Sequence, residues 1–162
     1  MDTFFATVTW FGSLYLLLPF SILICLLLLG AKRPQEAILL GLNLIVSVIS
    51  VHVAKLLFRR PRPDSLGLLV PMPSDWSFPS AHTAQATAFF LSITLIAIRI
   101  LPPFWAILTS LISLLIVAGV SYSRVYLQVH YPSDVLAGLA LAILLVLLVQ
   151  AILPHLYLPP EK

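Results

Sequence analysis

The sequence predicts an all-α, polytopic transmembrane bundle of about five spans, folded as a single domain over residues 1–162. The first reason is composition: 60% of the residues are hydrophobic, only 9% are charged, and the mean hydropathy is +1.08. Soluble domains use roughly 25% charged residues, so this chain must have lipid as its main solvent. The second reason is a series of five apolar windows, each near the roughly 20 helical residues that cross about 30 Å of hydrocarbon.

Prolines and charged residues separate these windows into successive helices. The breaks are Lys32-Arg33-Pro34, the proline-rich segment 59–79, Pro102-Pro103 and the polar segment 123–131, and all of them carry turn signals. The predicted spans are residues 12–30, 36–58, 82–101, 104–122 and 132–153. Residues 1–11 hold aromatic side chains that suit the membrane interface, although the same residues can also extend the first helix.

These spans place segments 59–79 and 123–131 together, so most of the unusual polar residues share one membrane face. Lys32, Arg33 and Arg99 lie at the opposite face, and the positive-inside rule makes that side cytoplasmic. A simple count that includes the arginines of the polar face favours the reverse orientation, but some of those arginines are candidates for chemistry. We therefore expect a polar site that faces the periplasm or the cell exterior.

Net charge and cysteine content exclude several other classes of protein. The formal charge is +3, yet the chain has no block of consecutive basic residues that can follow a nucleic-acid backbone. Cys25 is the only cysteine and lies in an apolar run, which excludes a disulfide framework and a site of several thiolates. We expect no cofactor, no metal and no obligate protein partner.

The first group of candidate residues is Lys55-x6-Arg62-Pro63, at the end of the second predicted span. Pro61 and Pro63 end the helix and extend the chain, so Arg62 lies on a stiff segment. A lone lysine at this depth can simply reach toward the interface. Lys55, Arg62 and Arg124 are nevertheless predicted at one face, where a phosphate would compensate all three charges.

The second group, Pro79-Ser80-Ala81-His82, is predicted to begin the third span. Ser80 is a suitable N-cap, and the backbone N–H groups that follow it are unpaired at the positive end of the helix. Such a helix start can bind a phosphate, although an ordinary capped helix has the same signature.

The third group is Ser123-Arg124-x5-His130-x3-Asp134. Pro132 suits the first turn of the last helix, and the spacing lets the imidazole of His130 meet the carboxylate of Asp134. A carboxylate on one ring nitrogen fixes the tautomer and leaves the other nitrogen free to act as a nucleophile or base. The alternative is a structural cap at a helix start.

The three groups together, in this order and spacing, resemble the type 2 phosphatidic acid phosphatase superfamily. That family includes membrane lipid phosphatases and soluble vanadium haloperoxidases that share a helical core. The resemblance covers residues 55–138 by motif and the earlier spans only by hydropathy. It implies active-site segments at residues 55–82 and 123–134.

The resemblance implies that His130 attacks phosphorus and forms a phosphohistidine, that Asp134 orients His130, and that His82 protonates the leaving oxygen before water hydrolyses the intermediate. It also implies a set of ligands for the phosphoryl oxygens, namely Lys55, Arg62, Ser80, Ala81 and Arg124. Phosphoryl transfer needs positioning and charge neutralisation in any case, and fixed cations supply both without magnesium.

Two features depart from the family pattern. Ala81 stands where the family usually has glycine, so the backbone there must adopt a negative φ or accept mild crowding near the phosphate. We expect activity to survive this change. Family members commonly have six spans, whereas about five are predicted here, and the first is expected to be missing.

Six further polar residues are expected to have structural roles. We predict that His52 packs between helices and that His155 belongs to an interfacial tail. Asp64 and Asp75 are expected to form turns, and Arg59 and Arg60 to anchor the protein at the membrane interface. The less favoured alternatives are support of the site for His52, metal binding for the two aspartates, and contact with a second phosphate or headgroup for the two arginines.

The predicted function is metal-independent hydrolysis of a lipid phosphate or diphosphate in a bacterial inner membrane, with the lipid and the bilayer as the only partners. Residues 130–134 resemble those of bacterial undecaprenyl diphosphate and phosphatidylglycerophosphate phosphatases. Undecaprenyl diphosphate therefore ranks first, phosphatidate or phosphatidylglycerophosphate second, and lipid A 1-phosphate third. Two alternatives stay open: a phosphotransferase that passes the phosphoryl group from His130 to another lipid, and a non-enzymatic membrane protein that binds anions.

Overall fold

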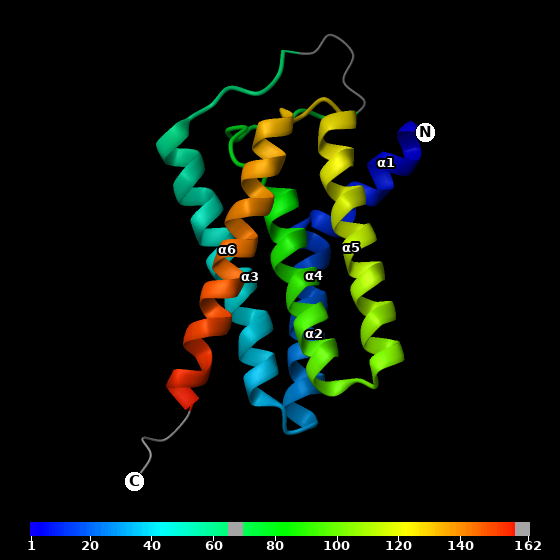
Figure 1. Cartoon of the computed structure of the whole chain (residues 1–162). Coiled ribbons are helices and arrows are strands. Elements are labelled where there is room, and N and C mark those ends of the chain that lie inside the picture. Colours follow the sequence, from blue (N-terminus) through cyan, green and yellow to red (C-terminus); the bar gives the residue numbers. More distant parts are fainter. Residues whose placement is uncertain (65–69, 158–162) are drawn as a thin grey trace.

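The computed structural model describes residues 1–64 and 70–157 of the chain, with side chains described through Leu153. The helices are α1 (Asp2–Val8), the 3-10 helix η1 (Thr9–Gly12), α2 (Leu14–Gly30), α3 (Pro34–Phe58), α4 (Ala81–Ile100), α5 (Pro103–Tyr126) and α6 (Pro132–Tyr157). Figure 1 shows α2 to α6 packed lengthwise into one bundle. The predicted all-α membrane bundle is confirmed, and the prediction for the His155 side chain lies outside the described residues.

The number of candidate spans agrees with the predicted number of about five. Within the described residues, α3 to α6 are each long and apolar enough to cross a membrane, and Asp2–Gly12 with Leu14–Gly30 makes a fifth span if the pair is counted as one. The two parts of this pair meet at Ser13, whose backbone is extended, and differ in direction by 46°. Residues 1–11 therefore form a separate short helix and a turn instead of a straight extension of the first span.

Aromatic contacts hold α1 against α5. The ring of Phe5 lies 5.2 Å from that of Tyr122 and 4.3 Å from that of Tyr126, measured between ring centres. The hydroxyl of Tyr126 also donates to the carboxylate of Asp2 at 2.7 Å. The first residues of the chain are thus fixed beside the end of α5 (Figure 1).

The predicted spans end too early at α5 and, by the same number of residues, at α6. The apolar window suggested an end near residue 122, but the helix continues to Tyr126. The hydroxyl of Ser123 donates to the carbonyl of Val120, and Arg124 is buried against other parts of the protein. These polar residues find partners inside the bundle, so the helix can continue past the end of its apolar sequence.

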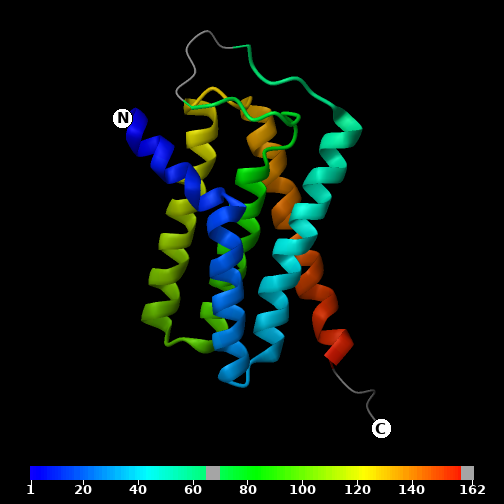
Figure 2. The ribbon, with the colours of Figure 1, turned by 180° about the vertical axis from the view of Figure 1, so that it is seen from behind.

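α4 lies in the middle of the bundle, behind α2 and α3 in the view of Figure 2. Ala84, Ala86 and Ala88 are completely buried on this helix, and small residues let neighbouring helices approach closely where lipid supplies no hydrophobic drive. The amide of Asn43 on α3 also donates to the hydroxyl of Ser92 on α4 at 2.8 Å. Exposed leucine and isoleucine side chains cover the outer faces of the other long helices, as lipid contact requires.

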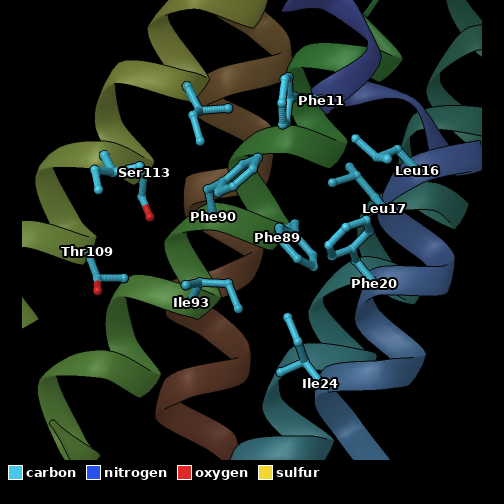
Figure 3. A pocket seen from close by; sticks show the side chains of 12 residues that line it. Phe11, Leu16, Leu17, Phe20, Ile24, Phe89, Phe90, Ile93, Thr109 and Ser113 are labelled. Atoms are coloured by element: carbon cyan, nitrogen blue, oxygen red, sulfur yellow. The ribbon is translucent and has the colours of Figure 1, made fainter.

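An apolar pocket of about 280 Å³ lies between α2, α4 and α5. Figure 3 shows its side chains pointing toward one another from these three helices, with Phe11 of η1 at one end. The lining includes Leu16, Leu17, Phe20, Ile24, Phe89, Phe90, Ile93, Thr109 and Ser113. Apolar side chains form most of this lining, so the pocket suits an apolar group.

A close crossing of α4 and α6 positions the polar end of the bundle. Gly138 on α6 lies so near the first turn of α4 that a Cβ atom at this position would be 2.7 Å from the carbonyl oxygen of Ser80. Glycine at residue 138 therefore allows the starts of α4 and α6 to lie side by side.

We expect Gly138→Ala to lower the free energy of unfolding by about 1–3 kcal/mol, because the added methyl must push the start of α4 away. Thermal unfolding in detergent measures this change. Gly30→Ala is the matched control, since no atom lies within 4 Å of a Cβ added there. Equal melting temperatures for the two variants would contradict the close crossing.

Candidate active site

The three predicted segments meet at one end of the bundle, where α4 and α6 begin and α5 ends (Figure 1). Two backbone hydrogen bonds join them: the N–H of Ser77 donates to the carbonyl of Arg60 at 2.9 Å, and the N–H of Ser80 donates to the carbonyl of Asp134 at 3.0 Å. A cavity of about 190 Å³ opens there. Its lining consists of Ser13, Leu14, Tyr15, Arg62, Pro73, Asp75, Ala81, His82, Gln85, Arg124 and His130.

His130 and Asp134 form the pair that their spacing predicted. Nδ1 of His130 lies 3.3 Å from Oδ2 of Asp134, and the two side chains are only 2% and 0% exposed. Asp134 lies in the first turn of α6, where the helix dipole favours a carboxylate. Its Oδ2 also accepts hydrogen bonds from the Tyr131 N–H and the Ser77 hydroxyl. The imidazole is therefore held by a carboxylate that is itself firmly fixed.

Arg62 determines which tautomer His130 adopts. Nη1 of Arg62 lies 3.2 Å from Nε2 of His130, and a guanidinium can only donate, so Nε2 must carry a lone pair. The ring proton then lies on Nδ1 and points at Asp134. Burial lowers the pKa of His130 to about 4, against the opposing hydrogen bond to Asp134 and with help from nearby cations. The imidazole is thus neutral at neutral pH, and the electron pair of Nε2 accepts the hydrogen bond from Arg62.

Arg60 binds the other oxygen of the same carboxylate. Its Nη1 donates to Oδ1 of Asp134 at 2.8 Å and to the Ser133 hydroxyl at 2.7 Å. The guanidinium also lies 4.1 Å from the centre of the Tyr131 ring, within the range of a cation–π contact. The predicted role of Arg60 as an interfacial anchor is therefore wrong. The reason is local, because the left-handed backbone of Arg59 (φ 44°) ends α3 and redirects the chain.

Lys55 and Arg62 share one carboxylate, that of Asp75. Nζ of Lys55 lies 3.0 Å from Oδ2, and Nη2 of Arg62 lies 2.5 Å from Oδ1. Arg62 is braced further by the carbonyls of Asp75 and Val129, at 2.8 and 2.7 Å. Burial alone would raise the pKa of Asp75, but Lys55 and Arg62 outweigh it and hold that pKa below its usual range. Asp75 was expected to serve only a turn, and the structure corrects this.

Arg124 lines the cavity from α5 and leaves one donor unpaired among the described residues. Its Nη1 donates to the hydroxyl of Thr9 in η1 at 2.7 Å, so the N-terminal segment contributes to the wall. Nε of Arg124 is buried and has no hydrogen-bond partner within the described part of the chain. Buried donors almost always have partners. An unpaired guanidinium N–H in a cavity that also contains Arg62 therefore marks a place for an anion.

The start of α4 provides the remaining wall. Ser80 occupies the N-cap position, as predicted, but its hydroxyl lies 3.0 Å from that of Thr83 and caps no backbone N–H. The expected side-chain cap is therefore wrong, because Thr83 competes for the hydroxyl. Ala81 begins the helix without a positive φ, so alanine is accommodated where the resembling family has glycine. Ala81 and His82 both line the cavity.

The structure thus brings most of the predicted site residues together. Arg62, Ala81, His82, Arg124 and His130 line the cavity. Lys55 and Asp134 are not among the lining residues, but Lys55 binds Asp75 and Asp134 binds His130, which both line the cavity. Ser80 is fully buried beside Ala81. Sequence reasoning did not find the contributions of Thr9, Arg60, Asp75 and Ser77. The one signal for Arg60 in the sequence was its position two residues before Arg62, inside a segment already predicted to form the site.

This arrangement can bind a tetrahedral anion and react with it. Buried cations neutralise charge on the anion, the unprotonated Nε2 of His130 can attack or accept a proton once Arg62 turns its N–H to the anion, and His82 in the same cavity can donate a proton. These are the requirements of phosphoryl transfer without a metal ion.

Comparison with known proteins identifies relatives with the same architecture. Residues 36–156 match the PAP2 superfamily. The crystal structure of a transmembrane PAP2 type phosphatidylglycerolphosphate phosphatase from Bacillus subtilis superposes with a TM-score of 0.86 at 28% identity, over 99% of this chain and 79% of that chain. The arrangement of the helices is therefore shared over essentially the whole chain.

Two curated relatives are similar in sequence. An undecaprenyl-diphosphatase from Sulfolobus acidocaldarius is 30% identical over 132 residues, which cover 79% of this chain and 59% of the relative. A decaprenylphosphoryl-5-phosphoribose phosphatase from Mycobacterium tuberculosis is 36% identical over 122 residues, which cover 72% of this chain and 63% of the relative. The matched region spans about three fifths of the length of these relatives.

We expect Arg60→Gln to raise the pKa of His130, because loss of the cation leaves Asp134 more negative beside the ring. Arg60 is partly exposed, and a pair of this kind is worth up to about 1 kcal/mol, so the pKa should rise by at most about 0.7 unit. Titration of labelled histidine by NMR measures the value. Arg59→Gln is the control, since Arg59 donates only to the nearby Leu56 carbonyl among the contacts described. An unchanged or lower pKa in Arg60→Gln would contradict the assignment.

Proposed function

The chain belongs to the PAP2 superfamily, and from this premise we propose that it is an integral-membrane lipid phosphatase. The observation that carries the proposal is one cavity lined by His130, His82 and Arg124. Nε2 of His130 accepts from Arg62 there, and Nε of Arg124 has no hydrogen-bond partner among the described residues. A nucleophile, a proton donor and an anion site occur together there. None of the three would be expected in a bundle that served only to anchor the protein in a membrane.

The first step of the proposed reaction is attack of Nε2 of His130 on phosphorus. A P–N bond forms, the bond from phosphorus to the lipid oxygen breaks, and His82 protonates that oxygen as the lipid leaves. Asp134 stabilises the positive charge that develops on His130, because it accepts the Nδ1 proton. Lys55, Arg62 and Arg124, together with the N–H groups at Ala81, neutralise the equatorial oxygens of the transition state.

The second step is hydrolysis of the phosphohistidine. A water molecule attacks phosphorus, the P–N bond breaks, and inorganic phosphate leaves while the electron pair returns to Nε2. His82, which gave up its proton in the first step, is placed to take one from the water. The fixed cations act in both steps, so the proposed chemistry does not use magnesium.

A groove between α2 and α3 supports a lipid substrate. It has a volume of about 430 Å³, and aliphatic side chains such as Leu18, Ile45 and Ile49 form most of its lining. Leu14 lines both this groove and the catalytic cavity. A lipid whose phosphate reaches His130 can therefore place its hydrocarbon tail in contact with the groove without leaving the bilayer.

We rank undecaprenyl diphosphate first among substrates, phosphatidate or phosphatidylglycerophosphate second, and lipid A 1-phosphate third. The Sulfolobus relative is an undecaprenyl-diphosphatase, which supports the first choice. The Bacillus structure is that of a phosphatidylglycerolphosphate phosphatase, which supports phosphatidylglycerophosphate. We further propose that the site faces the periplasm or exterior, because Lys32 and Arg33 lie at the opposite end of the bundle and favour the cytoplasmic side.

We expect the purified protein in detergent to release phosphate from undecaprenyl diphosphate in the presence of excess chelator. Orthovanadate should inhibit this release, since it mimics the pentacoordinate phosphorus of the transition state. A panel of the ranked lipids, assayed side by side at equal concentration, identifies the substrate from the ratios of kcat/KM.

Three outcomes would contradict the proposal. A strict requirement for magnesium would show that the fixed cations are insufficient. Binding of the lipids without turnover would favour the non-enzymatic alternative. If phosphate release falls when a second lipid is added and that lipid becomes phosphorylated, the phosphotransferase alternative is correct.

We expect His130→Gln to abolish the phosphoenzyme that forms from radiolabelled substrate, because glutamine offers no nucleophilic nitrogen. In the wild type, phosphoenzyme formation should persist down to about pH 5, since the pKa of His130 is lowered to about 4 and the ring stays neutral above it. Acid quenching at short times measures the labelled fraction.

His52→Gln is the matched control for this experiment. His52 is exposed on α3 and its Nδ1 lies 2.9 Å from the carbonyl of Val48 in its own helix. This variant should form the phosphoenzyme at the wild-type rate. Labelling of His130→Gln, or loss of labelling in the wild type already near pH 6.5, would disprove the assignment of the nucleophile.

A further inference from the structure

Asp75 places a negative charge among the cations of the catalytic cavity. Its two carboxylate oxygens bind two different cations, Lys55 at 3.0 Å and Arg62 at 2.5 Å. The proposed reaction assigns no step to this carboxylate, although Asp75 lines the cavity together with Arg124, His82 and His130. The position is therefore not explained by the catalytic roles described above.

The contacts of Arg62 show that Asp75 lies close to the reacting group. Nη2 of Arg62 binds Oδ1 of Asp75, while Nη1 of the same guanidinium lies 3.2 Å from Nε2 of His130. A phosphoryl group attacked by Nε2 must lie beside this guanidinium. Its oxygens and the carboxylate of Asp75 would then compete for the N–H groups of Arg62 and for the amine of Lys55.

Burial differs sharply between the partners. The side chains of Lys55 and Arg62 are only 4% and 8% exposed, whereas that of Asp75 is 51% exposed. A buried cation without an anion raises the free energy of the folded state, because it has lost its hydration and no opposite charge replaces it. A half-exposed carboxylate loses much less when it leaves its partners, since water replaces them.

We propose that Asp75 is a displaceable counter-anion that occupies the phosphate site of the substrate-free protein. The inference rests on the proposed phosphatase function and adds a binding residue to it. An arriving phosphoryl group exchanges with the carboxylate, so Lys55 and Arg62 are never left without an anion. When inorganic phosphate leaves, Asp75 returns to the same cations and so weakens the hold of the cavity on its product.

Substitution of Asp75 by asparagine tests this proposal. Asp75→Asn keeps the shape of the side chain but removes the competing charge, so phosphate binding should become tighter. We expect the Kd of inorganic phosphate, measured by calorimetry on the full chain in detergent, to fall about tenfold. The inhibition constants of orthovanadate and inorganic phosphate should fall in parallel, and KM should decrease as well.

Asp64→Asn is the matched control. Asp64 belongs to the same connection between α3 and α4, is exposed, and makes no hydrogen bond or ion pair with the other residues that the structure describes. This variant loses the same charge from the same loop. Its affinity for phosphate should equal that of the wild type, which separates competition at the site from a general change in potential.

Unchanged or weaker phosphate binding in Asp75→Asn would overturn the proposal. Weaker binding would mean instead that Asp75 positions Lys55 and Arg62 for the substrate. Asp75→Ser removes the same charge with a smaller side chain and gives an independent measurement if the asparagine variant does not fold. A wild-type protein that releases no phosphate from any lipid would refute the proposed function, whereas an active wild type without tighter binding in the variants refutes only this inference.

Discussion

One buried carboxylate, that of Asp134, holds the catalytic end of the bundle together. Its side chain contacts the imidazole of His130, the hydroxyl of Ser77, the N–H of Tyr131 and the guanidinium of Arg60, while its backbone carbonyl accepts from Ser80. A buried carboxylate is stable only if such donors surround it. The donors come from the α3–α4 connection, the N-cap of α4 and the α5–α6 connection, so the charge requires these segments to assemble.

The buried cations also need partners at this end of the bundle. Lys55, Arg62 and Arg124 are almost completely buried near the end of a lipid-embedded bundle, where an unpaired charge is expensive. Hydrogen bonds to backbone carbonyls and to the hydroxyl of Thr9, and the ion pairs with Asp75, offset part of this desolvation energy. The fold leaves the Nε of Arg124 without a partner in the described residues. Affinity for an anion is thus built into the folded state before any substrate arrives.

The success of sequence reasoning depended on the range over which each signal acts. Hydropathy sums over some twenty residues and predicted the spans. The contact of His130 and Asp134 was predictable because His130 closely precedes the last helix and Asp134 lies in its first turn. Arg60 and its partner Asp134 are 74 positions apart in the sequence. Asp75, the partner of Lys55, lies in an irregular loop. Neither segment has a period from which a contact can be inferred. The side chain of Ser80 was misassigned because cap statistics ignore competitors such as Thr83.

The attachment of the first residues to α5 has a practical consequence for protein engineering. Thr9 binds Arg124 and Asp2 binds Tyr126, so a fusion partner that pulled α1 away from α5 would also disturb the contact between Thr9 and an arginine of the cavity wall. The far end of α6 lies at the opposite end of the bundle from the start of that helix (Figure 1). Immobilisation, labelling and purification handles therefore belong at the carboxyl end.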